Sequence, residues 1–260
     1  MVQDPTQPAP KERIFVPLDT ADLARARHLA ALLAGEVGGL KLGKEFFTAH
    51  GPEGVRAVAG GARLFLDLKL HDIPNTVAGA VRAAVRLRPD LLTLHASGGP
   101  AMLRAAAQAA RAAAEEASLP RPRLLAITVL TSLDEDDLAA VGQRGPMAEQ
   151  VRRLAALARD NGLDGVVCSP REIADLRRLC GPEFLLAVPG IRPDWAAADD
   201  QKRVLSPAAA LAAGADVLVI GRPITGAPDP RAAARAIAYD LGGGPAGAGG
   251  QGAAAAPARR

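Results

Sequence analysis

The chain has 260 residues, of which 49% are hydrophobic, so it is long enough to bury one large core. Its 31 basic and 28 acidic residues give a formal net charge of +3 and are mixed along the sequence, without a basic stripe interleaved with aromatic residues. This pattern gives little support to a nucleic-acid polymer as a partner, and no apolar stretch approaches the length of a membrane span. We therefore expect neither partner.

The two ends of the sequence differ from its middle. Residues 1–12 are polar and proline-rich, with no apolar region of the kind found in signal peptides, so we expect a flexible segment of a cytoplasmic protein. Residues 242–260 are low-complexity Gly, Ala and Pro, and we expect a disordered tail. One domain is predicted between them, over residues 13–241. Cys168 and Cys180 are too few for a disulfide framework or a zinc site and are interpreted as core residues.

Short β-rich runs alternate with Ala- and Arg-rich stretches of helical character between these ends. The runs cover residues 14–19, 39–43, 63–70, 91–96, 124–131, 165–169, 184–191 and 217–222. Helices are predicted over residues 23–33, 101–117, 147–161 and 230–240, several of them preceded by Asp, Ser, Thr or Pro. This eightfold alternation predicts a (β/α)8 barrel in the α/β class. An open dinucleotide-binding sheet is disfavoured, because no Gly-x-Gly-x-x-Gly follows the first run.

Charged side chains occur in the first three predicted strands. Every second residue of 64–70 is leucine, so the two-residue period of a strand places the leucines on one face and Asp67 and Lys69 on the other. The same alternation puts Asp19 and Lys41 opposite their apolar neighbours. In a barrel this face points inward, and active sites lie at the carboxyl ends of the strands. Because a buried charge is costly unless paired, we predict a catalytic cluster rather than a structural ion-pair network. Pro17 lacks a ladder N–H and leaves the pairing of the first strand open.

The last two predicted strands lead into a candidate anion site. Gly190 lies near the end of the seventh and Arg192 directly follows it, whereas Gly221 and Arg222 end the eighth. Phosphate-binding barrels bind the anion with backbone N–H groups of the loops after these strands, and a guanidinium adds bidentate hydrogen bonds. One Gly-Arg turn would be ambiguous, but two on neighbouring strands favour a phosphorylated substrate.

The sequence "DLKLHDIPNTV" at residues 67–77, with "LKLG" before it and "LTS", "PGIR", "DDQKRV" and "IGRPIT" after it, closely resembles the bacterial type of the orotidine 5′-phosphate decarboxylase family. The similarity runs from about residue 13 to residue 239. It implies a (β/α)8 homodimer that converts orotidine 5′-monophosphate to UMP and carbon dioxide, the last step of de novo pyrimidine biosynthesis. It also implies that no metal and no organic cofactor takes part.

The resemblance further implies which residues form the site. An alternating constellation of catalytic lysines and aspartates corresponds to Lys41, Asp67, Lys69 and Asp72, with Asp72 contributed to the partner subunit's site. Substrate contacts are implied for Asp19, Lys41, Asp67, Ile73, Thr76, Thr131, Arg192, Gln201, Gly221 and Arg222. Among these, Asp19 and Lys41 would bind the ribose, Thr131 the pyrimidine, and the last four the phosphate. Loss of carbon dioxide leaves an electron pair on C6 of the pyrimidine, which the ammonium of Lys69 is expected to stabilise and protonate.

Three other interpretations remain open. Magnesium-dependent sugar-phosphate decarboxylases and aldolases also carry an Asp-x-Lys-x-x-Asp motif, but with a metal-ligating acid on the second strand, where this chain has Lys41. A non-catalytic nucleotide-phosphate binding protein would not need every charge of the constellation. A structural scaffold would leave the interior charges unexplained. We interpret His71 and His95, near the ends of the third and fourth strands, as structural histidines.

Overall fold

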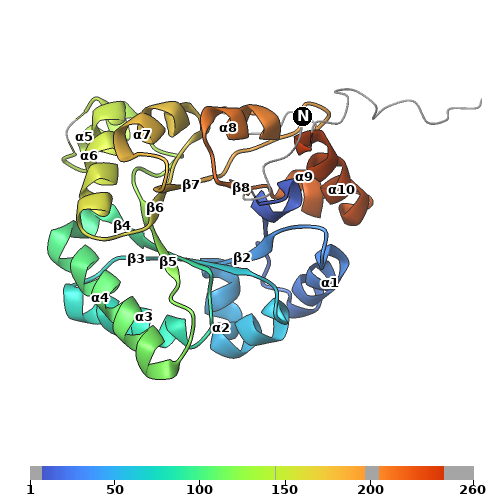
Figure 1. The fold of residues 1–260 in the computed structure, drawn as a ribbon, viewed down its shortest axis with the longest axis horizontal. Helices are drawn as coiled ribbons and strands as arrows, with labels where there is room; N and C mark the ends of the chain where they lie inside the picture. The colour runs from blue at the N-terminus through green and yellow to red at the C-terminus, as the bar shows by residue number, and fades with distance from the viewer. Residues whose placement is uncertain (1–7, 144, 197–204, 243–260) are drawn as a thin grey trace, which may run out of the picture.

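A computed structural model describes residues 8–143, 145–196 and 205–242, which form a closed barrel of parallel strands surrounded by helices (Figure 1). Strands that follow one another in sequence are paired, and β8 pairs with β1 to close the barrel. The strands are β1 (Ile14–Pro17), β2 (Gly39–Gly43), β3 (Leu64–Leu70), β4 (Leu91–His95), β5 (Arg123–Ile127), β6 (Gly165–Val167), β7 (Leu185–Val188) and β8 (Val217–Val219). The predicted (β/α)8 fold is confirmed.

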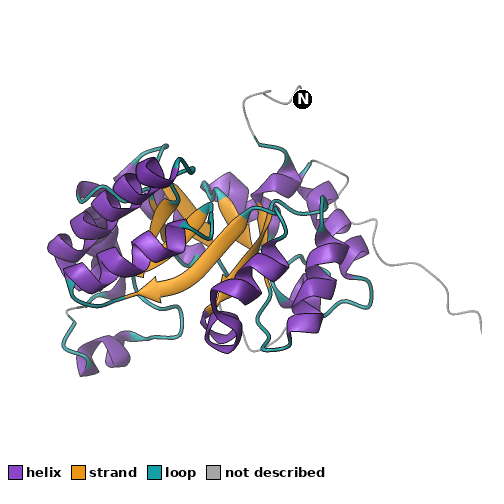
Figure 2. Cartoon of the chain, turned by 90° about the horizontal axis from the view of Figure 1, so that it is seen from below, coloured by secondary structure: helices purple, strands orange, loops and turns teal. Residues whose placement is uncertain are grey.

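Helices lie outside the barrel, and Figure 2 shows the strands in the middle of the molecule with helices on both sides. The α-helices are α1 (Leu23–Leu33), α2 (Lys44–Ala59), α3 (Pro74–Val85), α4 (Gly99–Ala117), α5 (Glu135–Ala140), α6 (Met147–Asp160), α7 (Ile173–Cys180), α8 (Pro207–Ala213), α9 (Arg222–Thr225) and α10 (Pro230–Leu241). Short 3-10 helices are η1 (Pro10–Arg13), η2 (Ala96–Gly98) and η3 (Pro170–Glu172). The side chains of Asp22 and Asp229 accept backbone N–H groups at the starts of α1 and α10, as the sequence predicts. No helix in the described part of the chain is both long and apolar enough to cross a membrane.

Several strands end earlier than predicted. The runs 124–131 and 217–222 are strands only as far as Ile127 and Val219. One more bond to β1 follows Val219, from the N–H of Ile220 to the carbonyl of Phe15 (3.1 Å). Pro17 is the last residue of β1, where it pairs with Lys41. The next ladder bond runs from the N–H of Leu18 to the carbonyl of Lys41 (2.9 Å), so the missing proline donor falls at the end of the strand and the pairing is preserved.

Alternation along the strands separates two apolar layers. The inner layer fills the barrel with Phe15, Phe65, Leu91, Leu125, Ala187, Val217 and Val219. The rings of Phe15 and Phe65 meet edge to face with centroids 6.1 Å apart. Residues of opposite parity, such as Leu40 and Leu42, belong to the outer layer that packs under the helices. In β3 the face predicted to point inward, with Phe65 and Asp67, is therefore the face that fills the barrel.

At the ends of the chain, the structure describes residues from 8 onward and as far as 242. Within the segment 1–12, which we expected to be flexible, Pro10 begins η1, and η1 packs against α10. Lys11 Nζ donates to the carbonyl of Gly35 (3.0 Å), which holds this turn on the barrel. Residues 1–7 and the predicted tail from 243 lie outside the described residues. Cys168 is buried in the core as predicted, and burial raises the pKa of its thiol.

A repeated aspartate clamp holds the amino-terminal end of the barrel. Asp90, Asp164 and Asp216 each precede an even-numbered strand, and each carboxylate accepts a backbone N–H of the strand before it, at 2.9, 2.7 and 2.8 Å. An arginine pairs with each carboxylate, namely Arg63, Arg121 and Arg177. The residue that directly precedes β2, the remaining even-numbered strand, is Gly38. A Cβ there would lie 2.1 Å from the carbonyl oxygen of Glu12. These clamps fix adjacent strands far from the carboxyl ends, where barrel residues contribute to stability.

We expect Asp216→Ala to lower the melting temperature, because the N–H of Leu186 and the guanidinium of Arg177 lose their shared acceptor. Leaving such groups unpaired costs about 1–3 kcal/mol, and a chain of this size loses about 2–4 °C for each kcal/mol. Differential scanning calorimetry measures the change. Asp175→Ala is the control, since its ion pairs with Arg152 and Arg178 are exposed, and it should melt like the wild type. Equal melting temperatures for both variants would refute the clamp.

Candidate active site

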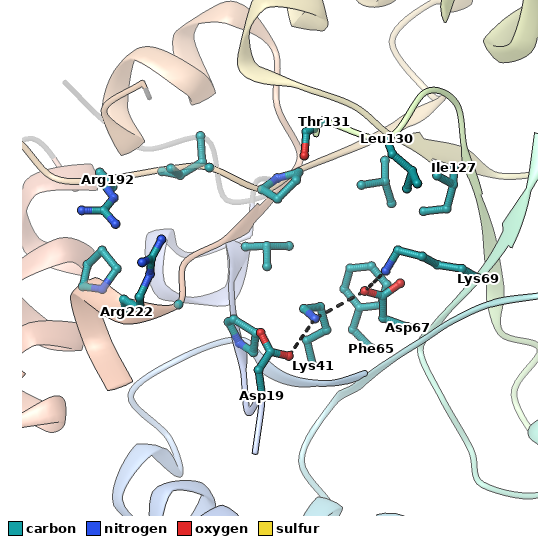
Figure 3. A pocket seen from close by; sticks show the side chains of 18 of the residues that line it. Asp19, Lys41, Phe65, Asp67, Lys69, Ile127, Leu130, Thr131, Arg192 and Arg222 are labelled. Carbon is teal, nitrogen blue, oxygen red and sulfur yellow. Dashed lines mark hydrogen bonds and ion pairs between the residues drawn. The ribbon is translucent and has the colours of Figure 1, made fainter. Parts of the chain in front are cut away.

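A cavity of about 310 Å³ opens where the strands of the barrel end (Figure 3). Its wall includes the last residues of β1, β5, β6 and β8, which are Pro17, Ile127, Val167 and Val219. Of the residues predicted from the sequence, those lining it are Asp19, Lys41, Asp67, Lys69, Thr131, Gly190, Arg192, Gly221 and Arg222. The fold thus brings together residues from distant parts of the chain, at the end of the barrel where active sites lie.

Alternating charges run along one side of the cavity. Lys41 Nζ lies 3.4 Å from Asp19 Oδ1 and 3.3 Å from Asp67 Oδ2. Lys69 Nζ lies 2.6 Å from the same oxygen of Asp67. The side chain of Asp67 is 11% exposed and that of Asp19 is 61% exposed. Asp67 is therefore the shared partner of two ammonium groups in a mostly buried setting, where opposite charges attract more strongly than in water.

The ionised form of Asp67 is favoured by this arrangement. Burial alone raises the pKa of its carboxyl group, but the charges of Lys41 and Lys69 and the hydrogen bonds from Lys69 and Thr93 outweigh burial. The pKa of Asp67 consequently lies below its ordinary value of 3.8. The cavity thus holds one fixed negative charge between two positive ones at neutral pH.

Thr93 on β4 connects the two charged residues of β3, a contact that the sequence analysis missed. Its buried hydroxyl donates to Asp67 Oδ1 (2.8 Å) and accepts the backbone N–H of Lys69 (2.9 Å). The register between β3 and β4 shifts between Leu66 and Leu70, and Lys69 has a φ of +51°. A non-glycine residue in this left-handed region costs about 1–2 kcal/mol. In the sequence, Thr93 is a single polar residue within the apolar run 91–94. Strand alternation does not predict which residues its side chain contacts.

Two arginines lie at the end of the cavity away from Lys69 (Figure 3). Arg192 follows β7 and is 9% exposed, whereas Arg222 is the first residue of α9. Gly190 has a φ of +76°, a conformation that favours glycine. A Cβ on Gly221 would meet Pro17 Cγ at 3.0 Å, so this close approach also favours glycine. The two Gly-Arg pairs therefore meet at one side of the cavity, where guanidinium groups suit a bidentate contact with an anion.

The remaining predicted residues do not line this cavity. Asp72 and Ile73 lie between β3 and α3, and Thr76 is in the first turn of α3. All three are exposed, Ile73 to 66%, and the carboxylate of Asp72 accepts the N–H of Ile73 (2.6 Å). Their contribution to a substrate site, in this chain or in a partner, stays a prediction. Gln201 lies outside the described residues.

His71 and His95 form a pair beside the charged side of the cavity, with ring centroids 5.3 Å apart. Burial, together with the nearby charges of His71, Lys44 and Lys69, lowers the pKa of His95 to about 4. His95 is therefore neutral at physiological pH, which agrees with its interpretation as a structural histidine.

Possible metal ligands are scattered rather than grouped. In the stretches 8–143, 145–196 and 205–242, no three His, Cys, Asp or Glu side chains lie close enough together to hold a metal ion. The two carboxylates of the cavity, Asp19 and Asp67, both contact Lys41 instead. The absence of a metal or cofactor stays a prediction.

Comparison with known proteins identifies the family. The model of the Orotidine 5′-phosphate decarboxylase / HUMPS family matches residues 12–237. The chain belongs to this family. The Orotidine 5′-phosphate decarboxylase of Paramagnetospirillum magneticum is 56% identical over 230 residues, which cover 88% of this chain and 98% of the relative. That of Rhodospirillum rubrum is 57% identical over 230 residues, covering 88% and 93%. These matches confirm the resemblance to the decarboxylase family and that the chain is an enzyme of this kind.

Solved structures agree with the barrel. The crystal structure of Orotidine 5′-phosphate decarboxylase from Lactobacillus acidophilus has a TM-score of 0.78 and 37% identity, and covers 88% of this chain and 98% of its own. The corresponding structure from Pyrococcus horikoshii, at 23% identity and a TM-score of 0.70, supports the fold alone.

The depressed pKa of His95 predicts a pH dependence of stability. The unfolded chain binds a proton at this histidine near its ordinary pKa of 6.5, whereas the folded chain binds it only near 4. Folding is therefore expected to lose stability as the pH falls from 6.5 towards 4, because the unfolded state takes up the proton first. Urea unfolding at several pH values measures the slope, and His95→Gln should flatten it. His28→Gln, at an exposed position, is the control and should keep the wild-type slope. An unchanged slope in His95→Gln would exclude this histidine as the source.

Proposed function

We propose that this chain converts orotidine 5′-monophosphate to UMP and carbon dioxide, the last step of de novo pyrimidine biosynthesis, in the cytoplasm and without a metal or an organic cofactor. The observation that carries the proposal is the polarity of the cavity. Lys69 Nζ lies 2.6 Å from Asp67 Oδ2 at one end, and Arg192 and Arg222 lie at the other. The names of relatives at 56% and 57% identity support this substrate.

Lys69 supplies the proton in the proposed reaction. The bond between C6 of the pyrimidine and its carboxylate breaks, and the electron pair stays on C6, where no conjugated group can accept it. An ammonium group against C6 stabilises this carbanion and then donates a proton to it. Carbon dioxide leaves, one N–H of Lys69 becomes the C6–H of UMP, and solvent returns a proton to the amine.

Asp67 and its neighbours orient the reacting groups. The ionised carboxylate of Asp67 holds Lys69 in place and lies beside the departing carboxylate, which it repels in the ground state more than in the transition state. Lys41 and Asp19, 3.4 Å apart, offer a donor and an acceptor to the ribose hydroxyls. The opposite charges of this side keep each ammonium paired while the substrate is absent.

The phosphate end supplies binding energy away from the reacting carbon. Arg192 and Arg222 bind the phosphate with charge-assisted hydrogen bonds, helped by the backbone of Gly221 and by Gln201. Thr131, between the two ends, contacts the pyrimidine. Energy from the phosphate helps to place C6 against Lys69, because remote contacts can offset the cost of orienting the reacting group.

The protein acts as a homodimer in this proposal. Asp72, Ile73 and Thr76 are exposed beyond the cavity of their own chain, where a second subunit can receive them. Each site then combines Lys41, Asp67 and Lys69 of one chain with the loop after β3 of the other.

Decarboxylation of orotidine 5′-monophosphate is expected to persist in EDTA and to depend on Lys69. Lys69→Ala should lower kcat by about 10²- to 10⁴-fold, the usual weight of a positioned proton donor. A spectrophotometric assay of UMP formation, with and without EDTA, measures both effects.

Lys11→Ala is the matched control, because the side chain of Lys11 donates to the surface carbonyl of Gly35 and does not line the cavity. The turnover of this variant should equal that of the wild type. Activity that disappears in EDTA would favour the magnesium-dependent sugar-phosphate group instead. Turnover by Lys69→Ala at the wild-type rate, with an unchanged circular dichroism spectrum, would remove Lys69 from the mechanism.

Arg222→Ala should weaken the use of phosphorylated substrate. We expect kcat/KM for orotidine 5′-monophosphate to fall by about 10- to 100-fold, the weight of a charge-assisted hydrogen bond. Orotidine, which lacks the phosphate, should be used equally by the variant and the wild type. The surface variant Arg178→Ala should leave both substrates unaffected. Equal losses on both substrates in Arg222→Ala would contradict the phosphate assignment.

Mixing two inactive variants tests whether Asp72 serves the partner's site. Lys69→Ala and Asp72→Ala should each be nearly inactive, but refolding an equal mixture gives about half heterodimers with one intact site each, so roughly a quarter of the wild-type activity returns. A mixture of Lys69→Ala and Asp67→Ala is the control and should recover nothing, because both residues serve their own chain's site. No recovery in the first mixture, with heterodimers confirmed by native mass spectrometry, would show that the site is not shared through Asp72.

A further inference from the structure

Thr93 occupies a position that neither the charge pattern nor the proposed reaction accounts for. Its side chain is completely buried, and its hydroxyl donates one hydrogen bond and accepts another. The donor goes to Asp67 Oδ1, and the acceptor receives the backbone N–H of Lys69. One hydroxyl therefore binds both members of the Asp67–Lys69 ion pair from the neighbouring strand.

The bond to Asp67 fixes which way its carboxylate faces. Asp67 Oδ2 lies 3.3 Å from Lys41 Nζ and 2.6 Å from Lys69 Nζ, and both contacts are drawn in Figure 3. Thr93 holds the other oxygen at 2.8 Å. Without this bond the carboxylate can rotate about its terminal torsion, which has a broad energy profile, and the oxygen shared by the two ammonium groups is no longer fixed.

The bond to the Lys69 amide supports an unusual backbone. The β3–β4 register shifts between Leu66 and Leu70, and Lys69 adopts a left-handed φ of +51° there. Such conformations persist only where surrounding contacts determine them, and they cluster at functional sites. The hydroxyl of Thr93 supplies an acceptor for the N–H at this irregularity. Return of Lys69 to an ordinary strand conformation would redirect its side chain.

We infer that Thr93 is a positioning residue for the reaction, which sets the placement of Lys69 Nζ through paired bonds to the Asp67 carboxylate and to the Lys69 backbone. The effect of Thr93 on catalysis rests on the proposed function, whereas its two hydrogen bonds do not depend on that function. Thr93 touches Asp67 and Lys69 and has no place among the residues that line the cavity. Its loss should therefore slow the chemical step more than it weakens substrate binding.

Thr93→Val, which keeps the shape and removes the hydroxyl, tests the inference in the full-length protein. We expect kcat to fall on the order of 10- to 100-fold, as for small misplacements of a catalytic group, with KM for orotidine 5′-monophosphate changed by less than about threefold. Thr93→Ser retains the hydroxyl and should keep kcat within about threefold of the wild type. If Thr93→Val does not fold, Thr93→Cys replaces it, because a thiol of similar size is a weak donor and a weak acceptor.

Thr128→Val is the matched control. Thr128 is another buried threonine, directly after β5, and its hydroxyl donates to the carbonyl of Val167 at 3.4 Å. This variant loses a hydroxyl of the same kind without touching Asp67 or Lys69, so kcat should stay at the wild-type value. Wild-type kcat in Thr93→Val, or an equal loss of kcat in Thr93→Ser, overturns the inference.

Amide hydrogen exchange followed by NMR gives a second measurement that needs no activity. The N–H of Lys69 should exchange faster in Thr93→Val than in the wild type, Thr93→Ser or Thr128→Val, because its acceptor is missing. An unchanged exchange rate overturns the support of the Lys69 backbone by Thr93. If the wild-type protein does not decarboxylate orotidine 5′-monophosphate, the proposed function fails, and the exchange rate still decides the structural part.

Discussion

The buried carboxylate of Asp67 is the interaction on which the rest of the site depends. Two ammonium groups converge on one of its oxygens, at 3.3 and 2.6 Å, and neither lysine could be held at the barrel mouth without a compensating charge. Burial would by itself favour the neutral acid, and the charges of the two lysines with the hydrogen bonds from Lys69 and Thr93 keep the carboxylate ionised. The charges are thus mutually dependent, which explains why they occur together at the mouth of an apolar barrel.

The barrel separates this cluster from the contacts that stabilise it. At the amino-terminal end, Asp90, Asp164 and Asp216 tie neighbouring strands together through backbone N–H groups and arginines. At the carboxyl end, β2 and β3 carry Lys41, Asp67 and Lys69, and the segments after β1, β5 and β7 carry Asp19, Thr131 and Arg192. The aromatic and aliphatic layer between the two ends fills the barrel. Loops can therefore differ in chemistry without loss of the fold, a general property of this architecture.

The cavity is polar at both ends, but in different ways. One side carries lysines and aspartates in balanced alternation, and the other carries two arginines. A ligand with a localised anion at one end and a second anionic group near Lys69 matches both sides at once, as orotidine 5′-monophosphate does with its phosphate and its carboxylate. Under the proposed function, binding energy at the phosphate acts on the distant carboxylate. Family membership and cavity charge therefore point to the same chemistry from independent observations.

The sequence alone determined the strand count, the barrel and which charged residues face inward. Alternation is a local property of an extended chain, so the inward position of Asp67 did not depend on knowing any neighbour. Strand ends were predicted less well, because the point where a ladder stops depends on the adjacent strand. Only the tertiary structure decided that Thr93 lies against Asp67 and Lys69, that Lys69 takes a left-handed conformation, and that Asp72 lies outside its own cavity. Each of these depends on register between strands or on the course of a loop, and both are set by contacts between residues far apart in the chain.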